Sequence, residues 1–228
     1  EVAIVIVGVV IGFQVTAWGN ERAARAQEQE LLQGLQTEFT DALVRLERQA
    51  GKHARIERDL TTILDALGRA EQAGAASVPV ADTTIAWALV PTTTQFSQGV
   101  LDGMLRTGRL QLVQDRELRT ALAEWPGVLA DVTEDEEASR DIVVYQLEPL
   151  LWRLMDVRSA RTYDLLLGTL PPSAMEATSD VPVNRELTGV LSTRRFWQRH
   201  TIREFSGPRE EATRILALID RSLTETAR

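Results

Sequence analysis

The first eighteen residues, EVAIVIVGVVIGFQVTAW, constrain the fold more than any other stretch of the chain. No charged residue occurs from Val2 to Trp18, and the polar side chains of that run are Gln14 and Thr16. At a rise of about 1.5 Å per residue the run spans roughly 25 Å, slightly less than a hydrocarbon core of about 30 Å. In lipid every backbone polar group needs an internal partner, so a single segment must be helical. The run therefore predicts a transmembrane helix over residues 1–19, truncated at its N-terminus.

Two other structures compete for this segment. A secretory signal peptide has a shorter apolar region and a small-residue cleavage site, whereas residues 14–18 lead directly into a charged helix. A buried parallel strand is about 4–8 residues long and is bounded by turn residues. We favour the membrane helix over both.

Four residues of the run have specific expected roles. Gly8 and Gly12 are four residues apart on one helix face, a spacing that lets another helix backbone approach closely. Gln14 is a polar amide that a partner helix could satisfy, and Trp18 is placed where an aromatic residue meets the lipid headgroups. We therefore predict membrane helix contacts through Gly8, Gly12 and Gln14, and an interfacial Trp18. The alternative is that glycines are simply common in membrane helices and that Gln14 lies at the wet end.

Composition and motifs argue against several function classes. A net charge of −8 argues against general nucleic-acid binding, which needs a basic surface. With no Cys and two His, an ordinary zinc site is not expected. No Walker A, Rossmann, HExxH, GxSxG or kinase motif is present. We therefore predict no enzyme activity, no metal and no cofactor.

A long amphipathic helix is predicted over residues 20–70. Its buried stripe has spacings that alternate between three and four residues, as in a heptad repeat. The stripe consists of Leu32, Leu35, Phe39, Ala42, Leu46, Gln49, His53, Ile56, Leu60, Ile63 and Leu67. It could form a dimeric coiled coil, giving a homo-oligomer through Leu32, Leu35, Phe39 and Leu46, or it could pack on the rest of its own chain. We favour the second alternative, with His53 as a hydrogen-bonded packing residue and not a ligand.

Residues 71–228 are predicted to complete an all-α extramembrane bundle, with loops near 68–80 and 158–183. Asp82, Thr92 or Thr93, Asp115 and Asn184 are expected N-caps, and Gly108 is an expected C-cap. Pro126-Gly127 and Gly207-Pro208 are expected to interrupt helices. The expected helices cover residues 83–89, 94–107, 115–125, 128–155 and 184–223, the last in two parts.

Three polar clusters have both a functional and a structural interpretation. The acidic run 131–137 is a weak metal site, since consecutive helical residues point in different directions, and a solvated face is expected. The run RRFWQRHTIR at 194–203 could touch lipid headgroups or an acidic partner, but an amphipathic helix with aromatics inward and Arg outward is preferred. The run 92–95 is explained by helix capping.

The N-terminal residues also carry a family resemblance. Residues 1–21, with Gly8, Gln14, Trp18 and Asn20-Glu21, resemble the opening of an uncharacterised family of bacterial single-pass membrane proteins with the pattern E-x6-G-x5-Q-x3-W-x-N-E-x-R. The likeness continues through residues 22–46 and through 94–125, where Thr107-Gly108-Arg109-Leu110 and Leu118-Arg119 match. The sequence departs from the family by an insertion near Gly19 and by Trp125-Pro126 in place of a tyrosine-rich helix.

This resemblance implies architecture and not catalytic residues, because the family has no known activity. Its members have a basic segment before the span, which implies a cytoplasmic N-terminus and a periplasmic C-terminal domain in the bacterial inner membrane. Arg22 and Arg25 follow the span here, so the orientation stays open.

The expected function is that of a non-enzymatic, single-pass accessory or scaffold subunit of a larger membrane protein complex. A respiratory or photosynthetic complex would suit, and its partners would be the lipid bilayer and other membrane subunits. The main alternative is a membrane-anchored sensor whose bundle binds a small ligand. A membrane-tethered enzyme is a third.

Overall fold

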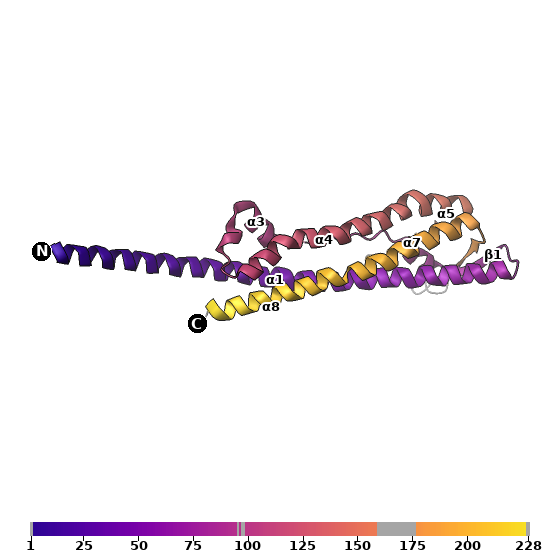
Figure 1. Cartoon of the computed structure of the whole chain (residues 1–228). Helices are drawn as coiled ribbons and strands as arrows, with labels where there is room; N and C mark the ends of the chain where they lie inside the picture. Colours follow the sequence, from indigo (N-terminus) through magenta and orange to yellow (C-terminus); the bar gives the residue numbers. More distant parts are fainter. Residues whose placement is uncertain (1, 95, 97–98, 159–176, 227–228) are drawn as a thin grey trace. The chain divides into compact units, whose positions relative to one another are not determined.

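The chain folds as an almost entirely helical protein, as the sequence predicts (Figure 1). The computed structural model describes residues 2–94, 96, 99–158 and 177–226, and it describes side chains of the first helix at residue 14 and from residue 16 onward. The described elements, in chain order, are α1 (Val2–Gln72), β1 (Ser77–Ala81), α2 (Asp82–Ala88), α3 (Gly99–Thr107), the 3-10 helix η1 (Arg109–Leu112), α4 (Arg116–Ile142), the π-helix η2 (Val143–Leu147), α5 (Glu148–Leu154), β2 (Thr178–Pro182), α7 (Arg185–Glu204) and α8 (Ser206–Thr226).

These elements form two compact units, and each unit is built from segments that are not consecutive in the sequence. The first unit consists of residues 1–45, 96–126 and 209–228, and the second of residues 46–95 and 127–208. Helices α1 and α4 each contribute residues to both units. The core of the first unit is therefore drawn from three separate stretches of sequence, and the core of the second unit from two.

Helix α1 runs without interruption from Val2 to Gln72, straight through Gly19-Asn20. Residues 16–27 are all exposed, and Glu28 is the first buried side chain among those described. No helix of the part described with side chains is long and apolar enough to cross a membrane. The side chains of residues 1–13 and 15, which make up most of the predicted transmembrane helix, lie outside that part.

The first unit is built around the predicted apolar stripe of α1. Its buried residues are Leu32, Leu35, Phe39 and Ala42 of α1, Leu101 and Met104 of α3, Val113, Leu118, Ala121, Leu122 and Trp125, and Ala212, Ile215, Leu218 and Ile219 of α8. The rings of Phe39 and Trp125 pack with centroids 5.1 Å apart. Gly108 adopts a left-handed conformation with φ of 72°, which confirms it as the residue that ends α3.

Burial along α1 favours packing of its stripe on its own chain. Leu32, Leu35 and Leu46 have no exposed surface, and Phe39 is 1% exposed, within a single chain. The stripe thus packs on its own chain. A homo-oligomer through these four residues has no exposed side chain to use in this fold.

The second unit has a separate apolar core, formed by α1 after residue 46 and by α2, η2, α5, α7 and the two strands. Its buried members are Ile56, Leu60, Ile63, Leu67, Val80, Ile85, Ala86, Ala88, Leu89, Val90, Val143, Leu147, Leu150, Leu151, Val157, Val181, Leu187 and Leu191. Asn184 caps α7 as predicted, because its side chain accepts a hydrogen bond of 3.0 Å from Leu187 N.

The second unit contains a two-stranded antiparallel ribbon in regions where the sequence predicts loops. The sequence does not predict this ribbon. Strand β1 pairs with β2 so that Pro79 faces Asp180 and Ser77 faces Pro182. The flanking bonds, Asp82 N to Ala177 O and Val183 N to Ala76 O, fix the alternation of the ladder. Pro79 and Pro182 then occupy positions whose backbone nitrogen points away from the partner strand, so neither proline removes an inter-strand hydrogen bond. Residues 159–176 of the predicted loop lie outside the described residues.

Several predicted helix boundaries are wrong for local reasons. Asp82 is the first residue of α2 and accepts a bond from Ser179 Oγ (2.6 Å) in place of capping. Helix α3 begins at Gly99, so neither Thr92 nor Thr93 caps it. Pro126 was expected to interrupt the helix but lies inside α4. Trp125 and Leu129, on either side of Pro126, are both buried, so the apolar stripe of α4 continues past the proline.

One expected break lies close to the observed one. The interruption predicted at Gly207-Pro208 falls at Phe205, between α7 and α8. Within the helix expected over residues 128–155, the π-helix η2 changes the helical register before α5 begins at Glu148, with Pro149 in its first turn. Asp115 caps α4 as predicted, because it accepts bonds from Glu117 N (2.8 Å) and Leu118 N (3.0 Å).

Candidate functional site

The most unusual arrangement of side chains is a buried polar layer inside the second unit. It consists of His53 of α1, Thr92 and Thr94 of the segment after α2, Glu136 and Ser139 of α4, and Arg194 and Gln198 of α7. None of these residues is more than 9% exposed. Burying this many polar groups is costly unless each is hydrogen-bonded, so their pairing reveals what the layer does.

Each of the three helices places its polar residues on its own apolar stripe. Along α4 and into η2 the stripe reads Leu129, Val132, Glu136, Ser139, Val143, and along α7 to the residue after it the stripe reads Leu187, Leu191, Arg194, Gln198, Thr201, Phe205. The spacings again alternate between three and four residues, as they do around His53 in α1. Helical periodicity therefore turns the polar residues inward at one level.

His53 lies at the centre of the layer. Its Nδ1 is 2.7 Å from Gln198 Oε1, and its Nε2 is 2.8 Å from Glu136 Oε1. Gln198 donates its own Nε2–H to Ser139 Oγ (2.7 Å), so the atom that it turns to His53 is an acceptor. Nδ1 must therefore donate. The ring of Phe205 covers the imidazole, with centroids 5.4 Å apart.

Glu136 is fully satisfied as a carboxylate. Oε2 accepts from Thr94 N (2.6 Å), and Oε1 accepts from Thr94 Oγ1 (2.7 Å) as well as facing His53 Nε2. Hydrogen bonds to both oxygens stabilise the ionised form. His53 and Glu136 therefore form a hydrogen-bonded pair with neither side chain exposed.

Arg194 adds a buried cation, with carbonyl oxygens as its partners. Nη1 donates to Ser139 O (3.1 Å) and Nη2 to Val90 O (2.7 Å), while Nε has no partner within the described residues. Burial lowers the pKa of Arg194 to about 9, and the charge of Glu148 opposes that shift. The side chain stays cationic at neutral pH and ties α4 and α7 to the start of the segment after α2.

This constellation does not have the geometry of a nucleophile–histidine–acid triad. A triad needs the hydroxyl and the carboxylate on opposite ring nitrogens. Here Thr92 Oγ1 (3.3 Å) and Glu136 Oε1 both face Nε2, and an amide faces Nδ1. The hydroxyls of Thr92 and Thr94 are also buried, which leaves no surface for a substrate. The layer is suited to fixing helix register.

A shallow groove of about 360 Å³ in the first unit is the alternative place for a small ligand. Glu38, Asp41, Phe96 and Val100 are among its lining residues. Glu38 already accepts from Val100 N (2.7 Å) and Leu101 N (3.3 Å), so it caps α3. Burial raises the pKa of Glu38, and these two backbone bonds oppose the shift. Both carboxylate oxygens of Glu38 therefore already accept hydrogen bonds, so Glu38 is not free to bind a ligand in the groove.

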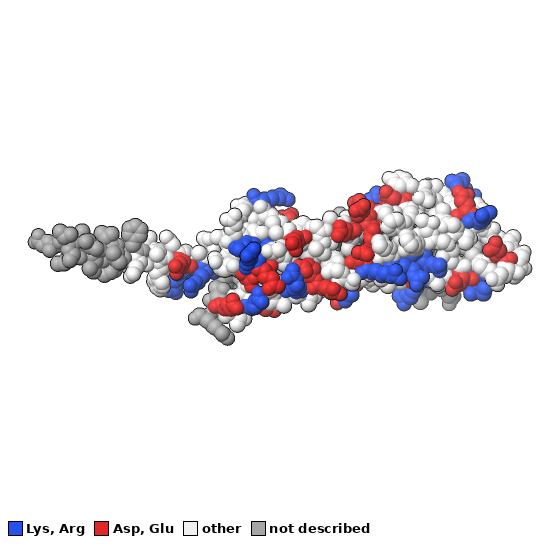
Figure 2. All heavy atoms as spheres, in the orientation of Figure 1, with Lys and Arg blue, Asp and Glu red and all other residues white. Residues whose placement is uncertain are grey.

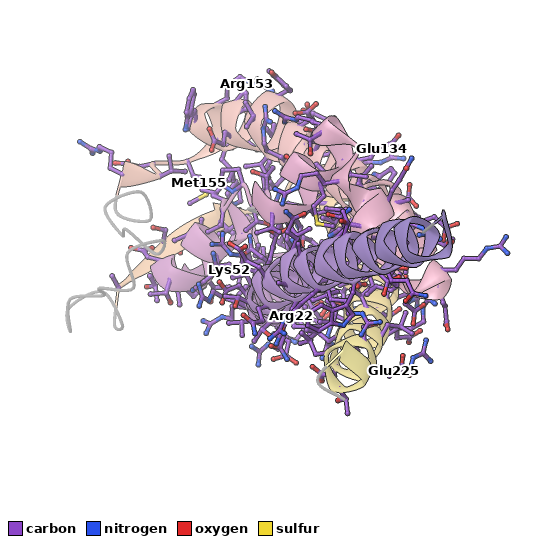
Figure 3. The ribbon with its side chains drawn as sticks, turned by 90° about the vertical axis from the view of Figure 1, so that its left-hand side faces the viewer. Arg22, Lys52, Glu134, Arg153, Met155 and Glu225 are labelled. Atoms are coloured by element: carbon purple, nitrogen blue, oxygen red, sulfur yellow. The ribbon has the colours of Figure 1, made fainter. Side chains whose placement is uncertain are left out.

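The predicted membrane residues are not part of the buried layer. Gly8 and Gly12 belong to α1, but the structure gives no surroundings for them. Gln14 is exposed, and Trp18 is 62% exposed with the Arg22 guanidinium 5.6 Å from its ring centroid. Figure 3 shows Arg22 on the outside of α1. The roles of these four residues stay predictions.

His53 is a hydrogen-bonded packing residue, as the sequence predicts, but the sequence pattern does not predict its partners. Glu136 was assigned to a solvated acidic face, yet it has no exposed surface. The basic run was expected to point aromatics inward and Arg outward, whereas Arg194 is buried and Phe196 is 64% exposed. The alternating spacing of the α4 and α7 stripes was the pattern that could have found both residues.

Metal binding and known relatives give no further assignment. Within the described residues no group of three His, Asp or Glu side chains could hold a metal ion. No protein-family model, curated protein or solved structure matches the chain. The likeness to bacterial single-pass membrane proteins therefore depends on the residues quoted for it.

Proposed function

We propose that this chain is a non-enzymatic, single-pass membrane protein whose helical units serve as an accessory or scaffold part of a larger membrane assembly. The observation that carries the proposal is the continuity of α1. One helix joins the uncharged run from Val2 to Trp18 to the core of both units, with no break at Gly19-Asn20. A continuous helix of this kind would connect a membrane segment to the body that it carries.

The exposed stretch after the apolar run supports the same proposal. Residues 16–27 contact no core, and Arg22 lies over the ring of Trp18. A Trp beside an Arg is suited to the headgroup region, where the ring meets acyl chains and the cation meets phosphates. We place the helical units on the periplasmic side of a bacterial inner membrane, as the family resemblance implies.

The buried polar layer supports a scaffold role. Its polar groups are occupied by one another, and it aligns α1, α4 and α7 at one level. In the membrane, Gly8 and Gly12 would let α1 approach another helix, and Gln14 would hydrogen-bond to it. Partners of this kind include the membrane subunits of respiratory or photosynthetic complexes.

Extraction in mild detergent followed by mass measurement of the intact particles tests the proposal. The wild-type chain should co-migrate with defined membrane partners, and Gly8→Ile with Gly12→Ile should reduce that retention. Gly19→Ile, at a glycine with open space around it, is the control and should retain the partners. A wild-type chain that extracts alone would contradict the accessory role, and unaffected retention in the double variant would remove the glycine contact.

Topology has its own test, because the natural chain contains no Cys. Ser192→Cys introduces one thiol on the exposed surface of α7. A membrane-impermeant maleimide should label it in cells whose outer membrane alone is permeabilised. Labelling only after the inner membrane is opened would place the helical units in the cytoplasm.

A further inference from the structure

The second unit has a basic stripe on α7, which consists of Arg195, Arg199 and Arg203. These residues are four apart, so they follow one another along one side of the helix, and none of them is buried. From Leu187 to Arg203, α7 contains no acidic residue. Figure 2 shows basic side chains gathered over α7. In a unit whose acidic residues outnumber its basic ones, the basic stripe is a distinct positive surface.

The side of α7 that carries the basic stripe lies next to α1 and away from α4. Arg199 Nε is 3.6 Å from Glu57 Oε1 of α1. Helix α7 contacts α4 through different residues, Arg194 and His200. The acidic residues of α4 therefore do not neutralise the basic stripe.

The contact with α1 neutralises the basic stripe only in part. The Arg199–Glu57 pair is long, and the Arg199 side chain is 60% exposed, so the pair is a weak one. Arg195 and Arg203 form no ion pair in the part of the chain that the structure describes. A guanidinium group binds a carboxylate through two parallel hydrogen bonds, which makes Arg well suited to recognise acidic side chains of another molecule.

An exposed aromatic ring lies within the basic stripe. Phe196 stands between Arg195 and Arg199 in the sequence and is 64% exposed. Its ring meets that of Trp197 edge-on with centroids 5.9 Å apart, and Trp197 meets His200 at the same distance. These contacts restrain an exposed side chain, so little freedom is lost when a partner covers it. Arg and aromatic residues together are typical of binding surfaces.

The dimensions of the basic stripe match one face of another α-helix. At about 1.5 Å per residue, the arginines follow one another at intervals of roughly 6 Å. A helix with acidic residues at every fourth position presents its carboxylates at the same interval, and two helices that pack at a small crossing angle keep such rows aligned. An anionic bilayer is a poorer match, because a broad surface would also meet the acidic residues of this unit.

We propose that the basic stripe is a docking surface for an acidic helix of a partner protein. The carboxylates of that helix pair with Arg195, Arg199 and Arg203, and an apolar residue among them packs on Phe196. This inference goes beyond the accessory role and does not depend on whether α1 enters a membrane. Its failure would therefore leave the accessory role untouched.

Binding of designed helical peptides to the full chain in detergent micelles tests the docking surface. The first peptide carries Glu at three positions four residues apart and a Leu beside the central Glu. The second has Gln at those three positions, and the third has the residues of the first in scrambled order. By fluorescence anisotropy at low salt, the first peptide should bind at least about tenfold more tightly than the other two. Raising NaCl from about 50 mM to about 500 mM should shrink this difference, because exposed charges are screened.

A charge exchange separates loss of binding from loss of fold. Arg195→Glu with Arg203→Glu keeps Arg199 and should abolish the preference for the Glu peptide. The same variant should instead prefer a peptide with Lys at the outer two positions and Glu at the central one, a gain that loss of fold cannot produce. The matched control, Arg48→Glu with Arg69→Glu, makes the same change of charge at exposed positions of α1 and should keep the wild-type preference.

Phe196→Ser tests the apolar contact separately. The ring adds apolar area and no charge, so this variant should bind the Glu and Gln peptides more weakly by a similar factor. Unchanged binding of both peptides would show that Phe196 is not part of the docking surface.

Three results would overturn the proposal. Equal binding of the Glu and Gln peptides would show that the basic stripe does not recognise carboxylates. Equal binding of the ordered and scrambled Glu peptides would show that it attracts any polyanion and does not recognise a helix. Displacement of the Glu peptide by micelles that contain phosphatidylglycerol, but not by neutral micelles, would assign the basic stripe to lipid headgroups.

Discussion

His53 and Glu136 are 83 residues apart in the chain and meet inside the second unit, where Nε2 lies 2.8 Å from Oε1 and neither side chain has exposed surface. The pair joins α1 to α4, and the amide of Gln198 extends the connection to α7. A shift of one helix by a single turn would leave these groups buried without partners. We infer that the polar layer selects one register for helices whose apolar stripes alone would permit several.

The first prediction concerns the loss of one partner in this layer. Glu136→Leu leaves His53 Nε2, Thr94 N and Thr94 Oγ1 without their acceptor, so unfolding free energy should fall by about 3–5 kcal/mol. Glu137→Leu, at the exposed neighbour, should change it by less than about 0.5 kcal/mol. Urea unfolding at constant m-value measures both, and equal effects at the two positions would contradict the assignment.

Glu136→Gln makes the same prediction sharper. A Gln at this position can accept from Thr94 N and donate its amide hydrogens to His53 Nε2 and Thr94 Oγ1. The substitution should therefore cost far less unfolding free energy than Leu, because each hydrogen bond keeps a partner. Urea unfolding of the two variants measures the difference. An equal cost for Gln and Leu would show that the layer needs the carboxylate and not only the hydrogen bonds.

The second prediction concerns the shape of the Arg194 side chain. The planar guanidinium reaches two carbonyl oxygens from different segments, Ser139 O and Val90 O. A Lys carries a point charge on a shorter head and cannot donate along both directions, so Arg194→Lys should lower unfolding free energy by about 1–3 kcal/mol. The control is Arg195→Lys on the surface, which should be near neutral. A neutral effect of Arg194→Lys would mean that charge, and not the forked geometry, is what the site requires.

Much of the fold follows from local patterns in the sequence. The stripe from Leu32 to Leu67 predicts a long helix, and Asp115, Gly108 and Asn184 mark boundaries that the structure has. These features depend on neighbours within about four residues, so a single sequence contains them. The membrane role of the first eighteen residues stays a prediction of the same kind.

The ribbon and the polar layer depend on residues that are far apart. Strand β1 has Pro79 in its centre and pairs with a segment about a hundred residues away, so no hairpin pattern announces it. Glu136 sits within a run of acids that reads as solvated until its spacing is aligned with Val132 and Ser139. Propensity rules rank Pro126 as a helix breaker, whereas packing of Trp125 and Leu129 carries α4 through it.

The third prediction compares two glycines at the end of α3. Gly108 has φ of 72°, a region that disfavours any side chain, so Gly108→Ala should destabilise the protein by about 1 kcal/mol. Gly103 lies inside the helix with open space around its Cβ position. Gly103→Ala should instead stabilise by about 0.5–1 kcal/mol. Thermal midpoints that move in the same direction for both variants would contradict the left-handed cap.

The last prediction concerns the pH dependence of the Asp115 cap. Burial raises the pKa of this carboxyl, but hydrogen bonds from Arg221 and from the backbone N–H groups of Leu118 and Glu117 outweigh it and hold the pKa below its usual value. A lowered folded-state pKa contributes stability that is present above the unfolded pKa of about 3.9 and is lost as pH falls through the folded value.

Asp115→Asn keeps a capping oxygen but loses the charged contact with Arg221, which is 2.7 Å long and half exposed on the Arg side. The variant should be less stable than the wild type by roughly 0.5–1 kcal/mol at pH 7, and the gap should close between about pH 4 and pH 2. In an Arg221→Met background the pH-dependent gap should shrink without vanishing, because the backbone N–H bonds remain. A gap that is constant from pH 7 to pH 2 would show that the cap acts through shape alone.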